Sequence, residues 1–235
     1  QEGSLCEWSP ASATNTLAAA LAEQRASAGT GVGAPHDSKE IDLAPIRVIQ
    51  DEYATYSAVA VDNVRDEIVL QDENLFQILV YDRKANTPPS AKMTEPKRIL
   101  GGPKTKIEFN CGLYVDPASG DIYSVNNDTT DTMVIFDHSA KGDVPPVREL
   151  HTPHGSYGIA VDEINQEMFF TVEHDNALVA YKKTAAGEDQ PLRMIQGDHT
   201  QLADPHGVAV DAKNNWVFVV NHGSTHRVKD DPAKP

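Results

Sequence analysis

The sequence predicts an all-β fold built from a unit of about fifty residues that occurs four times. Each unit contains an apolar run that ends in an aspartate, and these aspartates lie 54, 46 and 49 positions apart. A second apolar run follows each aspartate at the same offset, and no long amphipathic helix separates the units. A period of this length suits a four-stranded β unit better than a helical hairpin. The four marker aspartates are Asp62, Asp116, Asp162 and Asp211.

The first two strands of each unit are predicted around the marker aspartate. The first strand covers residues 57–62, 111–116, 157–162 and 206–211, and it carries small residues that suit a crowded centre. The second strand is under way six residues after the aspartate, at Ile68, Ile122, Met168 and Val217. Its β-branched and aromatic residues favour a strand, and Asn, Asp and Gly bound it. The aspartates themselves are expected to accept backbone N–H groups in the turn between the two strands.

A third and a fourth strand complete the predicted unit. The third is an apolar run ending in an aromatic residue, at 78–81, 133–136 and 178–181. The fourth begins with proline followed by arginine and an aliphatic residue, at 45–49, 96–100, 146–150 and 191–195. Proline cannot donate a ladder hydrogen bond, so this strand is expected at the outer edge of the sheet.

Units with small residues innermost and proline outermost predict a β-propeller of four-stranded antiparallel blades, about four of which are visible. The pattern Gly-[Ile/Val]-Ala-Val-Asp, then Ile-Tyr-Val, then Val-[Tyr/Phe]-Asp resembles NHL repeats and their six-bladed relatives over about residues 45–223. That resemblance implies a six-bladed ring, of which this chain would form part. A closed four-bladed ring is the alternative.

The fourth unit is expected to be incomplete, because the segment near Asp230 is not a convincing third strand. The remaining blades would then be removed by processing, supplied by a second chain that completes the propeller, or lie in a part of the protein outside this sequence. The domain organisation predicted is a short N-terminal helix and linker at 1–44, the blades at 45–223 and a polar tail at 224–235.

Composition limits the classes of partner and the compartment. The formal net charge of −15 argues against nucleic-acid binding, which needs clustered Lys and Arg. No apolar run is long enough to span a membrane. The chain begins at Gln1, which is consistent with removal of a secretory signal and predicts a secreted protein, extracellular or periplasmic. Cys6 and Cys111 could form a disulfide, or Cys111 could be a buried thiol.

Histidines in units three and four are the candidate metal ligands. They lie near strand ends, where loops reach one rim of a propeller, and the ion considered is zinc, copper or calcium. In the related peptidyl-hydroxyglycine amidating lyases, histidines on separate blades bind zinc, and Pro205-His206-Gly207 resembles one such turn. Here the positions equivalent to His206 are Ser57, Cys111 and Tyr157, so ordinary hydrogen-bonding histidines are the alternative. The candidates are His154, His174, His206 and His222.

The sequence favours a secreted or cell-surface binding or assembly module over an enzyme, and no catalytic residue is assigned. A protein partner, or a second copy of the chain, would be recognised through blade-end loops or through exposed strand edges at 45–50 and 216–220. The alternative is a metal-dependent lyase or hydrolase with a histidine site at the mouth of the central channel.

Overall fold

The computed structural model describes residues 43–127 and 129–222. The chain divides into two compact units, Gln1–Ala44 and Pro45–Pro235, and the fold below is that of the second unit. The predicted N-terminal helix, the polar tail at 224–235 and Cys6 lie outside the described residues. None of the described residues belongs to a helix with the length and apolar character needed to cross a bilayer.

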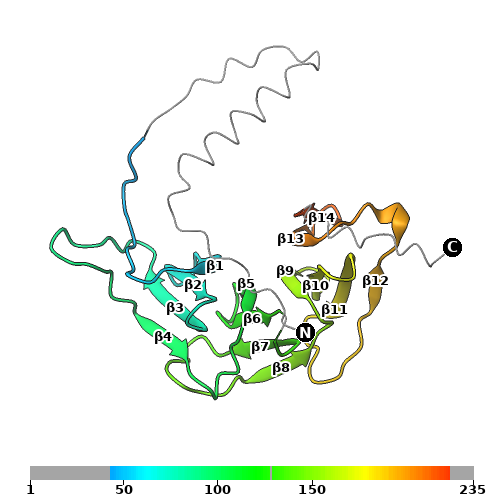
Figure 1. Ribbon diagram of the computed structural model, residues 1–235, viewed down its shortest axis with the longest axis horizontal. Coiled ribbons are helices and arrows are strands. Elements are labelled where there is room, and N and C mark those ends of the chain that lie inside the picture. Colours follow the sequence, from blue (N-terminus) through cyan, green and yellow to red (C-terminus); the bar gives the residue numbers. More distant parts are fainter. Residues whose placement is uncertain (1–42, 128, 223–235) are drawn as a thin grey trace, which may run out of the picture. The chain divides into compact units, whose positions relative to one another are not determined.

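The described residues form four antiparallel sheets, which confirms the predicted propeller blades (Figure 1). Blade 1 contains β1 (Tyr56–Asp62), β2 (Glu67–Asp72), β3 (Gln77–Asp82) and β4 (Arg98–Gly101). Blade 2 contains β5 (Asn110–Val115), β6 (Ile122–Asn126), β7 (Thr132–Phe136) and β8 (Arg148–His151). Blade 3 contains β9 (Ser156–Asp162), β10 (Glu167–Val172), β11 (Ala177–Lys182) and β12 (Arg193–Ile195). Blade 4 contains β13 (Pro205–Asp211) and β14 (Trp216–Asn221), after a 3₁₀ turn at Asp198–Thr200.

The first strand of each blade is innermost, and each contacts the first strand of the next blade. Two glycines permit this close approach. A Cβ at Gly112 would lie 2.5 Å from the carbonyl oxygen of Tyr157, and one at Gly158 would lie 2.2 Å from that of His206. Any larger residue would push the innermost strands apart, which explains the small residues that the sequence places there.

Proline-led segments supply the outermost strands of the first three blades, as predicted: β4, β8 and β12 pair with β3, β7 and β11. The prediction was wrong for residues 45–50, which form no strand. Thr87 N donates to Val48 O at 2.8 Å, and Thr94 N donates to Gln50 O at 2.8 Å. Because the loop between β3 and β4 already occupies these backbone groups, this segment is not the exposed edge expected from sequence.

The hydrophobic core lies between successive blades in three clusters. In each cluster the buried face of one blade packs against the opposite face of the next. Between blades 3 and 4, for example, Phe169, Leu178 and Ala180 pack against Val208 and Val210. Each internal blade therefore buries both of its faces, which is the arrangement that radial repetition requires.

The marker aspartates have the structural role that the sequence predicted. Asp62 Oδ1 accepts hydrogen bonds from the backbone N–H groups of Val64 and Arg65, each at 2.9 Å. Asp162 Oδ1 accepts the equivalent pair from Ile164 and Asn165, each at 2.8 Å. These turns fix the register of the first strand against the second in each blade.

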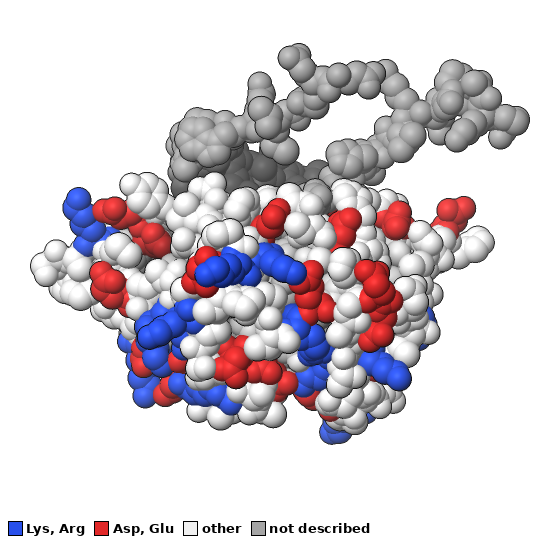
Figure 2. All heavy atoms as spheres, turned by 90° about the horizontal axis from the view of Figure 1, so that it is seen from below, with Lys and Arg blue, Asp and Glu red and all other residues white. Residues whose placement is uncertain are grey.

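In blades 1 and 3, the arginine of the outer strand reaches back to the glutamate that begins the second strand of its own blade. Arg98 donates two hydrogen bonds of 2.9 Å to the carboxylate of Glu67, and Arg193 pairs with Glu167 in the same way. Figure 2 shows acidic and basic side chains intermixed on the face seen from below. In these two blades the Pro-x-Arg signature therefore combines an edge position with a cation that neutralises a carboxylate of the same blade, whereas Arg148 of blade 2 donates to the backbone carbonyls of Lys183 and Ala185.

Candidate functional site

The four candidate histidines lie together at one rim of blades 3 and 4, with three carboxylates. His154 precedes β9, His174 follows β10, His206 lies on β13 and His222 follows β14. We call the group the histidine cluster; its members are His154, His174, His206, His222, Asp131, Glu173 and Asp204. The sequence identified the histidines and missed the carboxylates. The motif Asp204-Pro-His-Gly and the neighbour pair Glu173-His174 were the available signals.

Glu173 connects the two halves of the cluster. Its Oε1 lies 3.3 Å from His174 Nε2, and its Oε2 lies 2.9 Å from His206 Nε2. The rings of His154 and His174 are 5.1 Å apart, and His154 Nδ1 lies 2.9 Å from Asp131 Oδ1. Carboxylates from the turns of three blades therefore face imidazoles from two of them.

Asp204 lies between His206 and His222. Its Oδ1 is 3.1 Å from His206 Nε2, and its Oδ2 is 3.3 Å from His222 Nδ1. The backbone supports this arrangement, since His222 N donates to Asp204 O at 2.8 Å and Asp204 N donates to Asn176 Oδ1 at 2.7 Å. Asp204 adopts φ of 51°, a left-handed conformation that aspartate tolerates better than most residues.

Three aromatic rings stack across the boundary between blades 3 and 4. Tyr157 and His206 have ring centroids 3.9 Å apart at 15°, and His206 and His222 have centroids 4.5 Å apart at 7°. Burial, together with the nearby thiol of Cys111 and the carboxylate of Glu173, raises the pKa of Tyr157 to about 12. The Tyr157 hydroxyl is therefore protonated at neutral pH. The stack restricts the ring of His206, which is partly buried, to a narrow range of orientations.

Residues at equivalent positions on successive innermost strands lie together in space, which confirms the strand register expected from sequence. Cys111, Tyr157 and His206 line one cavity of about 210 Å³ at the inner face of the blades. Cys111 is buried, and its pairing with Cys6 falls outside the described residues. Ser57, at the fourth equivalent position, donates from its hydroxyl to the carbonyl of Asn110 at 2.6 Å. This inner row is chemically mixed, and only its last member belongs to the histidine cluster.

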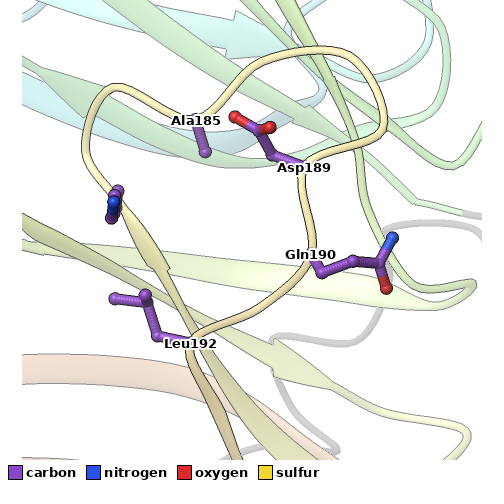
Figure 3. A pocket seen from close by; sticks show the side chains of 5 residues that line it. Ala185, Asp189, Gln190 and Leu192 are labelled. Carbon is purple, nitrogen blue, oxygen red and sulfur yellow. The ribbon is translucent and has the colours of Figure 1, made fainter.

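A separate pocket of about 220 Å³ lies in the loop between β11 and β12 (Figure 3). In Figure 3 the carboxylate of Asp189 extends toward Ala185, while the side chain of Gln190 extends away from it. Asp189 Oδ2 accepts a hydrogen bond from Ala186 N at 3.0 Å. Asp189, the acidic residue that lines this pocket, is thus already used to hold the loop. The pocket shares no residue with the histidine cluster.

Blade 4 presents an exposed apolar face that is covered in every other blade. Val69, Tyr123, Phe169 and Phe218 occupy the same register position on the second strand of their blades. The first three are 1%, 3% and 6% exposed because the next blade covers them, whereas Phe218 is 52% exposed. We call Trp216, Phe218 and Val220 the trailing face.

Blade 1 has the opposite exposed face. Val59 and Val61 correspond in register to Ile159 and Val161 of blade 3, which pack against the core shared with blade 2. In blade 1 the two valines are 63% and 52% exposed. We call Val59 and Val61 the leading face. Within the described residues, the first and the last blade therefore each expose an apolar face, and the equivalent faces of the other blades are buried between neighbouring blades.

Comparisons with known proteins establish the fold. No family model matches the chain, and no curated protein matches it. A chain of the structure described as "Crystal Structure of Mitotic Checkpoint Complex" is similar with a TM-score of 0.57 and 8% identity, over 75% of this chain and 49% of that chain. A chain of Kuenenia stuttgartiensis hydrazine synthase is similar with a TM-score of 0.56 and 10% identity, over 78% of this chain and 47% of that one. This chain thus spans about half the length of these two chains. The likeness supports a β-propeller fold. Membership of the NHL-repeat family stays a prediction.

Proposed function

We propose that this chain is a propeller-type assembly module in which the trailing face of one copy packs against the leading face of a second copy. The observation that carries this proposal is the register equivalence of both exposed faces with buried inter-blade surfaces. The same two kinds of face meet at each of the three interfaces between the described blades. The protein's own blade interfaces therefore supply the template for the contact.

The chemistry of the two faces suits such a contact. Phe218 and Val220 of the trailing face would meet Val59 and Val61 of the leading face, as Phe169 meets Val208 and Val210 inside the chain. Fully burying a side chain of this kind contributes about 1.5–3 kcal/mol. A contact between two different faces is heterologous, and it closes into a ring when the rotation between copies permits.

The test is the oligomeric state of the full chain and of single-face variants, measured by light scattering and native mass spectrometry. We expect the wild-type chain to dimerise. Phe218→Asp and Val59→Asp should each weaken association about 100-fold, because each places a carboxylate in an apolar contact. Ile164→Asp is the matched control, since Ile164 is 69% exposed in the turn between β9 and β10, away from both faces.

Mixing the two face variants separates this proposal from other modes of dimerisation. A Phe218→Asp copy retains an intact leading face, and a Val59→Asp copy retains an intact trailing face. The mixture should therefore form heterodimers through one unmodified contact, at concentrations at which each variant alone is monomeric. A monomeric wild-type chain, or a dimer that both substitutions leave unchanged, would refute the proposal.

A further inference from the structure

We propose that Asp204, His206 and His222 form a binding site for one divalent transition-metal ion of the Zn²⁺ type. This inference goes beyond the assembly function and uses none of the trailing-face or leading-face residues. Each of the three residues offers one ligand atom, and these atoms all lie within 4.8 Å of one another.

Each of the two imidazole nitrogens lies near one oxygen of the Asp204 carboxylate. Nitrogen and oxygen ligands bind Zn²⁺ at about 2.0–2.2 Å with tetrahedral geometry, which places neighbouring ligand atoms about 3.3–3.6 Å apart. His206 Nε2 is 3.1 Å from Oδ1 of Asp204, and His222 Nδ1 is 3.3 Å from its other oxygen, Oδ2. Because the two imidazole rings are stacked at 7°, an ion shared by both nitrogens requires one ring to rotate, and we expect this of His222, whose side chain is 60% exposed.

The surrounding structure holds the Asp204 backbone and the ring of His206 in place. The hydrogen bond from His222 N to Asp204 O joins the two chain segments that carry them, and stacking on Tyr157 orients the His206 ring. Glu173, from blade 3, lies 2.9 Å from His206 Nε2, the nitrogen that would bind the ion, and is therefore positioned to supply a further oxygen ligand. An ion bound here would therefore also connect blade 4 to blade 3.

The proposed ligand set is narrower than the four histidines identified from sequence. His154 and His174 lie on turns of blade 3, where the ring of His154 is beside Asp131 of blade 2 and that of His174 is beside Glu173. Two imidazoles and one carboxylate suit zinc, copper or nickel. Calcium is disfavoured, because it takes six to eight oxygen ligands.

Metal binding is tested on untagged full-length chain after chelator treatment and dialysis. Zn²⁺ alone is the probe for isothermal titration, and Co²⁺ is used for its absorption spectrum, which reports nitrogen and oxygen coordination. We expect one ion per chain. Asp204→Asn, His206→Ala and His222→Ala should each weaken binding by at least about 100-fold, because removing even an outer-shell partner of a metal ligand costs 10–100-fold.

His154→Ala is the matched control, because the side chains of His154 and His222 are 58% and 60% exposed. It should retain wild-type affinity, which would exclude general binding by surface histidines. Thermal melting without added metal checks that each variant folds. Absence of stoichiometric binding to the wild-type chain would overturn the proposal, as would wild-type affinity in a folded His222→Ala or Asp204→Asn variant. Because the measurement does not depend on dimerisation, its failure is distinguishable from failure of the assembly proposal.

Discussion

Replacing Glu67 with glutamine should destabilise the fold by about 3 kcal/mol at neutral pH. The Glu67 side chain is 3% exposed, and it pairs with Arg98, Lys97 and His138. Burial alone would raise the pKa of Glu67, but the hydrogen bonds from Arg98 and Lys97 outweigh it and lower the pKa from 4.5 to about 2. A difference of this size between unfolded and folded chains corresponds to the stated free energy.

The pH dependence identifies the source of that stability. Because the folded pKa lies below the unfolded one, the contribution is fully present above about pH 5 and is lost as the pH falls toward 2. About half of it should remain at pH 3. Urea unfolding of wild-type and Glu67→Gln chains at one protein concentration measures the difference. An unchanged difference between pH 7 and pH 2.5 would refute the electrostatic explanation and assign the loss to packing.

Glu167→Gln is the control for this experiment, because Glu167 has the same register position in blade 3. Its partner Arg193 is 51% exposed, so solvent screens the pair. The expected loss is about 1 kcal/mol or less. Similar losses at Glu67 and Glu167 would contradict the role assigned to burial.

Two further predictions concern contacts between blades, and urea unfolding measures both. The amine of Lys183 lies 2.6 Å from Asp116 Oδ2 of blade 2, and the Lys183 side chain is only 9% exposed. Lys183→Met should therefore lower the free energy of unfolding by about 3 kcal/mol. A decrease below about 1 kcal/mol would contradict the role of Lys183 in linking the two blades. Gly158→Ala should cost about 2 kcal/mol or more, because the new methyl group meets a backbone carbonyl of the next blade. In a monomeric Phe218→Asp background, Gly207→Ala should change stability by only about 0.5 kcal/mol, since its nearest neighbour lies 3.5 Å away.

The repeat made the blades predictable because it specifies register within a short stretch of chain. Each marker aspartate, such as Asp62, binds backbone groups only two and three residues away. The segment at 45–50 was mispredicted because its partners are distant in sequence. Thr87 and Thr94 lie about forty residues further along, and no local pattern indicates that a loop will take the hydrogen bonds of a strand-like segment.

The candidate site was predictable in part for the same reason. His206 follows from the repeat register and His222 from the end of a predicted strand. Their carboxylate partner Asp204 lies in the turn before β13, and its role depends on how that turn folds back toward the end of β14. The contact between Glu173 and His206 crosses from one blade to the next. Side-chain directions across a blade boundary are set by packing, which a sequence pattern does not encode.

The composition of β14 itself argues for a covered trailing face. Residues 216–220 are apolar at five consecutive positions. A strand with one solvated face normally alternates apolar and polar residues, whereas a continuous apolar run is typical of a strand buried on both faces. Val217 and Val219 pack against blade 3, while Trp216 and Phe218 face away and are 61% and 52% exposed. Because the sequence supplies apolar residues to both faces, β14 has the composition of an internal propeller strand, and a second copy that buries the trailing face would give it the matching environment.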